Sequence, residues 1–245
     1  MTEPVIRFTK VDKCFGRSEV LRDVDFAIPE GAFFGLAGVN GAGKTTLIKC
    51  LLDFCAIDGG DISLFGTPHR NPASRERIAF LPERFNPPYY LTGRDFLRYM
   101  LSLHRQPWSE PRLAEILDQL GLDAAAMTRP VRAYSKGMTQ KLGLAACFLS
   151  DRDLYILDEP LSGLDPSARI RVKTLLAQLK KAGRTLFFTS HALHDIEDIC
   201  DHMVILHQGQ PRFTGPPRSL LDEYGETSME RAFLRCIETP QLKAQ

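Results

Sequence analysis

The segment from Gly38 to Thr45, Gly-Val-Asn-Gly-Ala-Gly-Lys-Thr, constrains the fold of this chain more than any other stretch. It follows the short apolar run 31–37, which predicts a buried strand, and precedes residues 45–54, where leucine and isoleucine recur at helical spacing. This order is typical of a phosphate-binding loop, because glycines let the backbone close around phosphate oxygens and the first N–H groups of the helix point at them. A glycine-rich turn without a ligand is the simpler alternative, and the flanking strand and helix favour phosphate binding.

The residues of this loop have different expected roles towards a bound nucleotide. The ammonium group of Lys44 would reach the β- and γ-phosphates and assist catalysis, and the hydroxyl group of Thr45 would bind Mg²⁺. The other loop positions expected to contact the nucleotide are Gly38, Asn40, Gly41, Ala42, Gly43 and Thr46. The loop therefore predicts a nucleotide-binding protein that uses magnesium.

The composition is that of an ordinary soluble globular protein. Among 245 residues the formal net charge is +1, so no bulk electrostatic attraction to nucleic acid or to a membrane is expected. No apolar run approaches the length of a bilayer span, and the first residues lack the features of a secretory signal. The six cysteines are scattered and form no Cys-x-x-Cys pair, which predicts buried, reduced thiols in a cytoplasmic protein.

The segments around the loop predict an α/β protein with a helical insertion. Residues 5–8 and 20–28 alternate as strands do, and further short strands are expected at 61–65 and 78–81. From about 87 to 150 the periodicity is helical, with Ser109 as a helix N-cap and Gly121 as a helix end. One apolar helix face is expected from Phe96, Leu97, Met100, Leu101 and Leu103. The preceding loop 84–90, with two prolines and two tyrosines, is expected to be an exposed contact surface.

Two adjacent carboxylates follow the unbroken apolar run 154–157. Such a run is typical of a strand buried on both faces of a parallel sheet, and open α/β sheets bind ligands at the carboxyl ends of their strands. Asp158 would contact Mg²⁺, and Glu159 would orient or deprotonate the attacking water. The alternative is that both residues cap a following turn.

Further signals lie on either side of these motifs. Asp165 is expected to cap a helix that runs through Ile170, Leu175, Leu176 and Leu179 and ends at Gly183. His191 ends a buried strand at 185–190 and is expected to sense the γ-phosphate, whereas metal binding by histidine pairs is not predicted. Phe15 either stacks on an adenine or belongs to the core. A hairpin is expected near 203–214, followed by a short helical tail.

The segment Tyr134-Ser-Lys-Gly-Met-Thr-Gln140, just upstream of the carboxylates, resembles a family signature usually written Leu-Ser-Gly-Gly-Gln. With the other motifs it makes nearly the whole chain similar to the ATP-binding subunits of ABC transporters. Ser135 and Gly137 match the signature, whereas Lys136 and Met138 depart from it. The variant Tyr-Ser-Lys-Gly-Met is similar to those of bacterial export-type ATPases, and the tail segment 228–233 is similar to the ends of ATPases that serve the ABC-2 type of exporter.

The resemblance implies a fold and a set of ligands. It implies an α/β phosphate-loop NTPase core with a mixed β-sheet, an N-terminal antiparallel β subdomain and a helical insertion. The ATPase domain would span 1–216, with its helical subdomain at about 87–150 and a C-terminal helical tail at 217–245. The ligands would be ATP and Mg²⁺.

The resemblance also implies roles for individual residues. Phe15 would stack on the adenine, and His191 would act as the switch histidine. Glu83 falls where the family has a glutamine that contacts Mg²⁺ and the membrane partner. The segment with Ser135 and Gly137 would face the γ-phosphate bound by a partner subunit, and the loop 162–165 would cross the dimer interface.

The function implied is ATP hydrolysis in the energy-coupling subunit of an exporter. Two copies, or one copy and a homologous subunit, would sandwich two ATP molecules and drive separate membrane permease subunits from the cytoplasmic face of the inner membrane. Nucleic acid is not expected as a partner. The alternatives are a non-transport ABC ATPase acting on ribosomes or DNA and a different phosphate-loop enzyme such as a kinase. A single ATPase domain with an insertion of ordinary size favours the transporter subunit.

Overall fold

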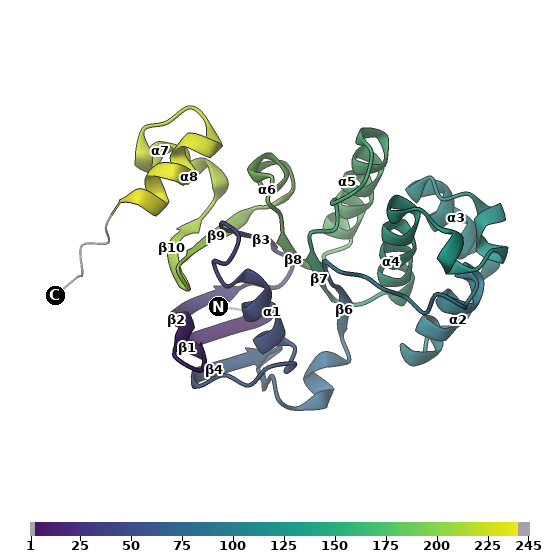
Figure 1. The fold of residues 1–245 in the computed structure, drawn as a ribbon, viewed down its shortest axis with the longest axis horizontal. Helices are drawn as coiled ribbons and strands as arrows, with labels where there is room; N and C mark the ends of the chain where they lie inside the picture. Colours follow the sequence, from purple (N-terminus) through teal and green to yellow (C-terminus); the bar gives the residue numbers. More distant parts are fainter. Residues whose placement is uncertain (1–2, 240–245) are drawn as a thin grey trace. The chain divides into compact units, whose positions relative to one another are not determined.

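The computed structural model describes residues 3–239 (Figure 1), so residues 1, 2 and 240–245 of the predicted domain and tail lie outside the described part. The chain forms two compact units. The first contains Met1–Glu76 and Thr185–Gln245, and the second contains Arg77–Arg184. Among the described residues no helix is long and apolar enough to cross a membrane.

An antiparallel sheet forms the amino-terminal part of the first unit. Its strands follow the order β2-β1-β4-β5: β2 (Ser18–Ile28), β1 (Ile6–Phe15), β4 (Gly59–Leu64) and β5 (Thr67–Pro68). Apolar side chains alternate along β1 and β2, and Phe8 of β1 packs on Phe26 of β2 with ring centroids 4.7 Å apart. The predicted N-terminal antiparallel subdomain is therefore confirmed.

A mixed sheet follows in the same unit. β3 (Phe33–Ala37) pairs in parallel with both β8 (Thr185–Thr189) and β9 (His202–His207), and β10 (Gln210–Gly215) runs antiparallel to β9. All residues of β3 and β8 are buried, as expected for strands covered on both faces. The helix α6 (Leu193–Ile199) contacts β3 so closely that a Cβ atom on Gly35 would lie 2.5 Å from Ile196 Cγ2. The helix α1 (Lys44–Leu51) starts directly after the glycine loop.

Up to residue 239, the predicted tail contains two helices, α7 (Pro217–Tyr224) and α8 (Met229–Glu238). Gly225, with a φ of 61°, ends α7 in the left-handed conformation that glycine adopts most readily. Both helices contact each other and β10, and their apolar faces bury Leu220 and Phe233.

The second unit contains the parallel pair of β6 (Ile78–Leu81) and β7 (Leu154–Asp158) and a set of helices. These are α2 (Gly93–Leu103), α3 (Glu110–Leu120), α4 (Lys136–Ser150) and α5 (Pro166–Lys181). α4 is buried along most of its length and contacts α2, α3 and β6. Short 3-10 turns at Ala124–Thr128 and Val131–Ala133 connect α3 with α4. Between 87 and 150 the described backbone contains helices and one isolated bridge, so the predicted helical character is confirmed.

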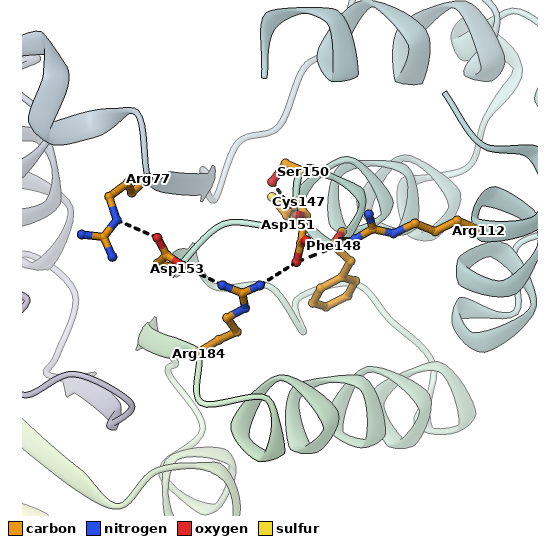
Figure 2. A network of polar contacts seen from close by, with 8 residues as sticks. All are labelled: Arg77, Arg112, Cys147, Phe148, Ser150, Asp151, Asp153 and Arg184. Carbon is orange, nitrogen blue, oxygen red and sulfur yellow. Dashed lines mark hydrogen bonds and ion pairs between the residues drawn. The ribbon is translucent and has the colours of Figure 1, made fainter. Parts of the chain in front are cut away.

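Ion pairs join the chain segments at the start of β6 and β7 (Figure 2). Asp153 accepts hydrogen bonds from Arg77 Nε and Arg184 Nη1, each at 2.6 Å, and Arg184 also bonds Asp151 at 2.9 Å. Asp151 is in turn 3.9 Å from Arg112 of α3. The network links the ends of five elements of this unit: β6, β7, α3, α4 and α5.

The predicted burial of Cys14 is wrong, and two apolar residues of predicted helices, Leu103 and Ile170, lie outside the buried helix faces. Leu103 is 60% exposed because it is the last residue of α2, beyond the turn that packs inward. Ile170 is 67% exposed because α5 buries Ala168, Val172, Leu175 and Leu176, and Ile170 lies on the other side of the helix. Cys14 is exposed in β1, contrary to the prediction that the thiols are buried. All six thiols are free.

Candidate nucleotide-binding site

The glycine loop between β3 and α1 leaves no room for side chains at two positions. A Cβ atom on Gly38 would lie 2.4 Å from the carbonyl oxygen of Leu206, and one on Gly43 would lie 2.9 Å from that of Val20. Gly43 also has a φ of 107°, which side chains rarely allow. The close approach of these strands requires glycine at both positions.

The turn between β9 and β10 is hydrogen-bonded to the glycine loop. Gly209 N–H donates to the carbonyl oxygen of Ala42 at 3.1 Å, and Arg22 N–H donates to that of Gly209 at 2.9 Å. A Cβ atom on Gly209 would lie 2.5 Å from the carbonyl oxygen of Val20. The sequence predicted this turn but not its contact with the loop, which only the fold reveals.

Lys44 is the first residue of α1 and is buried. Its Nζ donates to the carbonyl oxygen of Gly38 at 2.6 Å and to that of Val39 at 3.3 Å, so the side chain folds back over the loop. The first N–H groups of a helix have no acceptor within the helix and form its positive end. This cradle of close backbone, ammonium and helix end fits a triphosphate.

The other predicted loop residues are accessible to different degrees. Asn40, Gly41 and Thr45 are exposed, Thr46 is half-buried and Ala42 is buried. No three His, Cys, Asp or Glu side chains gather as a metal site within 3–239. That finding is compatible with Mg²⁺, which is usually held by one or two carboxylates together with substrate phosphates.

Phe15 lies at the end of β1, and its side chain is 52% exposed, so it is not a core residue. Lys13 Nζ lies 5.1 Å from the centre of the Phe15 ring, within reach of a cation–π contact. The carboxylate of Asp58 forms an ion pair with Lys13, with Oδ2 3.1 Å from Nζ, and accepts a hydrogen bond from the N–H of Cys14 at 2.6 Å. The pKa of Asp58 is lowered by the N–H of Cys14 and by Lys13, and the pKa of Lys13 is raised by its hydrogen bond to Asp58.

His191 is exposed and follows β8. Because β8 pairs in parallel with β3, with Thr189 opposite Leu36, His191 and the phosphate loop follow the carboxyl ends of neighbouring strands. The Oγ of Ser190 accepts the N–H of Ala192 at 3.1 Å, which shapes the turn that carries His191. The predicted position at the ligand edge of the sheet agrees with this geometry.

In the second unit the two adjacent carboxylates are buried. Asp158 is 4% exposed at the end of β7, and Glu159 is 7% exposed with a φ of 52°. The next helix, α5, is capped by Asp165, whose Oδ1 accepts the N–H of Ala168 at 2.9 Å. Asp165, and neither Asp158 nor Glu159, is therefore the cap of α5. Glu83 is exposed beyond β6, which pairs in parallel with β7, so it follows the same edge as Asp158.

Ser135 and Gly137 lie at the start of α4. The Oγ of Ser135 accepts the N–H of Met138 at 3.2 Å, so Ser135 caps the helix. The stem of Lys136 packs on Gly163, where a Cβ atom would lie 2.9 Å from Lys136 Cε. Gln140, to which the sequence assigned no role, is buried and donates to the carbonyl oxygen of Pro160 at 3.0 Å.

The predicted site residues thus fall into two sets. The phosphate loop, Phe15 and His191 belong to the first unit. Glu83, Ser135, Gly137, Asp158 and Glu159 belong to the second.

Comparison with known proteins decides the family. Residues 21–162 match the profile described as ABC transporter. The chain belongs to the ABC transporter family. This confirms the predicted family, the phosphate-loop α/β fold and the class of ABC ATPases.

Several sequence relatives support this assignment. An uncharacterised ABC transporter ATP-binding protein of Nostoc sp. is 42% identical over 207 residues, which cover 82% of this chain and 61% of that protein. A similar protein of Synechocystis sp. is 40% identical over 195 residues, which cover 78% of this chain and 55% of that protein. The Nod factor export ATP-binding protein I of Sinorhizobium fredii is 34% identical over 228 residues, which cover 91% of this chain and 66% of that protein. The chain therefore spans about three fifths of the first two relatives.

Solved structures support the fold. The ATP-binding subunit of an ABC transporter is similar with a TM-score of 0.86 and 28% identity, over 95% of this chain and 99% of that chain. A dimeric ATP-binding cassette bound to ADP and Pi is similar with a TM-score of 0.78 and 20% identity, over 86% of this chain and 98% of that chain.

Proposed function

We propose that this chain binds ATP with Mg²⁺ and hydrolyses it as the energy-coupling subunit of an exporter. The observation that carries the proposal is the glycine cradle. Gly38 and Gly43 leave no room for side chains, and the ammonium group of Lys44 is held over the loop carbonyls at the start of α1. Backbone closeness of this kind serves phosphate binding, because it brings N–H groups within reach of phosphate oxygens.

Each site residue has a role that follows from its chemistry. Lys44 and the N–H groups at the start of α1 would bind phosphates, and the exposed ring of Phe15 offers a face for the adenine. The oxygens of Thr45, Asp158 and Glu83 are of the kind that hold Mg²⁺, which neutralises phosphate charge when bound. Glu159 would take the proton of the attacking water, and the accessible imidazole of His191 would contact the γ-phosphate.

Replacement of Glu159 by glutamine tests this assignment. The amide still accepts a hydrogen bond but is a poor base, so hydrolysis should fall about 100-fold or more while ATP binding persists. Glu115→Gln, on the exposed surface of α3, is the matched control and should hydrolyse ATP at the parental rate. Hydrolysis by Glu159→Gln at the parental rate would remove Glu159 from the mechanism.

The proposed partner of one subunit is a second ATPase subunit. Ser135 and Gly137 lie at the positive end of α4, a helix of 15 residues, and this end would face the γ-phosphate held by the other subunit. The exposed loop 162–163 packs against Lys136 and would join the same interface. Each ATP would then lie between the phosphate loop of one subunit and the signature segment of the other.

The proposed second partner is a membrane permease, on the cytoplasmic face of the membrane. Export is favoured by the relatives named for Nod factor export. The loop 84–90 exposes the rings of Tyr89 (66%) and Tyr90 (68%), and aromatic side chains of this kind are enriched at protein interfaces. Together with Glu83 this loop would contact the permease.

A further inference from the structure

The buried side-chain amide of Gln140, in α4, is hydrogen-bonded to the backbone at Glu159, the proposed base. Its Nε2 donates to the carbonyl oxygen of Pro160 at 3.0 Å and to that of Glu159 at 3.5 Å. The side chain of Gln140 is buried, and Gln140 precedes Pro160 by 20 residues in the sequence. One NH₂ group thus lies within hydrogen-bond distance of two consecutive carbonyl oxygens.

The backbone at Glu159 requires such support. Its φ of 52° is unfavourable for a residue with a Cβ atom, and such conformations persist only where surrounding contacts fix them. Ser162 N–H also donates to the carbonyl oxygen of Glu159, at 3.1 Å, and closes the turn. The amide of Gln140 and this turn together set the orientation of the Glu159 peptide and hence the direction of its side chain.

We propose that Gln140 is a positioning residue for the reaction: by binding the carbonyl oxygens of Glu159 and Pro160 it holds Glu159 in the geometry that water activation requires. The inference rests on the proposed function, in which Glu159 is the base. Gln140 does not touch the nucleotide in this scheme, so its loss affects turnover and leaves nucleotide affinity unchanged. A displaced base lowers turnover because proton transfer depends on hydrogen-bond geometry.

Two substitutions separate positioning from general stability. Gln140→Leu keeps the size of the side chain and removes both donors, and it should lower kcat at least about tenfold with little change in KM for ATP. Gln140→Glu presents a carboxylate to two carbonyl oxygens at high pH, but its protonated form again has an O–H to donate. The ratio of its kcat to that of the parental protein should therefore rise as pH falls from about 8.5 to 6, because carbonyl neighbours and burial favour the neutral acid. The same ratio for Gln140→Leu should be flat.

The control lies at the other end of the same helix. Ser150 is fully buried and its Oγ donates to the carbonyl oxygen of Cys147 at 2.7 Å (Figure 2), so Ser150→Ala also removes one side chain–backbone bond from α4. It should retain the parental kcat even if its melting temperature falls.

Three outcomes decide the inference. A folded Gln140→Leu protein with the parental kcat would overturn it, as would a flat pH ratio for Gln140→Glu. If Gln140→Leu does not fold, the pH ratio of Gln140→Glu decides within one folded protein. A parental chain that does not hydrolyse ATP would instead overturn the proposed function, and the inference with it.

Discussion

Two glycines of the phosphate loop are required for different physical reasons. Gly41 has a φ of 80° but open space around it, so only the backbone conformation disfavours a side chain. Gly43 has a φ of 107°, and a Cβ atom there would lie 2.9 Å from the carbonyl oxygen of Val20 and 2.8 Å from Leu21 Cδ2. A side chain at Gly43 would therefore displace backbone as well as strain it.

Alanine at the two positions should consequently have unequal effects. Gly41→Ala should lower the free energy of unfolding by about 1–2 kcal/mol, the cost of a left-handed residue. Gly43→Ala should cost roughly 1–3 kcal/mol more, because the clash adds to the strain, and should weaken ATP binding more strongly. Denaturant unfolding and nucleotide titration measure both quantities. Equal losses in the two variants would contradict the close approach at Gly43.

Asp58 gives the chain a pH-dependent contact beside Phe15. Its pKa is lowered in the folded protein, so the stability that its charge contributes is present above the ordinary aspartate pKa of about 3.9 and is lost as pH falls through the lowered value. At pH 7 the melting temperature of the parental protein should be higher than that of Asp58→Asn, and this difference should shrink below about pH 4. Lys13 remains charged throughout this range, since its pKa is raised. A difference that stays constant down to pH 3 would show that the charge is not responsible.

At the scale of single elements, local signals predicted the structure where local chemistry decides it. The cap at Ser109, the helix end at Gly121 and the cap at Asp165 depend on a few neighbouring residues, and all three predictions are confirmed. The glycine loop with Lys44 is equally local. The exposure of Ile170 depends instead on which side of α5 meets the protein, which local chemistry does not decide. The contacts of Gln140 with Pro160 and of Gly209 with Ala42 join distant segments, so no sequence pattern carried them.

The ion network at the ends of β6, β7, α3, α4 and α5 belongs to the same scale (Figure 2). Asp153 pairs with both Arg77 and Arg184, and all three side chains are partly exposed. Asp153→Asn should lower the free energy of unfolding by about 1 kcal/mol, the upper range for exposed pairs, because it leaves two guanidinium groups without that carboxylate. The loss should shrink in 1 M NaCl, where exposed charges are screened.

A single exposed pair provides the control for the network. Glu19 and Arg22 are 3.6 Å apart and both half-exposed, so Glu19→Gln should change stability by less than about 0.5 kcal/mol. Denaturant melts of both variants at low and high salt make the comparison. An equal effect of the two substitutions would mean that the network adds nothing beyond isolated pairs.

At the scale of the whole molecule, the proposed dimer makes each site composite. Ser135→Arg should abolish hydrolysis but leave nucleotide binding to the monomer intact, because Ser135 would act on the ATP of the other subunit. Lys44→Ala should be inactive through its own phosphate loop. Mixed in equal amounts, the two inactive proteins should recover about a quarter of the parental rate, since half of the dimers are mixed and each has one complete site. No recovery at any mixing ratio would contradict the shared site.

Coupling to a permease provides the last prediction, and it concerns Glu83. Its carboxylate is exposed in the segment that follows β6, and an ionised group binds Mg²⁺ or a basic permease residue more strongly than the glutamine of the family pattern. Glu83→Ala should leave ATP affinity nearly intact, because the cradle with Lys44 dominates phosphate binding. Transport by the reconstituted complex, and stimulation of hydrolysis by the permease, should fall roughly tenfold or more, since loss of a charged contact at an interface costs more than about 1.4 kcal/mol.

Glu83→Gln separates charge from hydrogen bonding: partial transport would assign the effect to the charge, and full transport to the hydrogen bond. Normal transport by Glu83→Ala would leave Glu83 with no role beyond that of a residue in the exposed turn after β6.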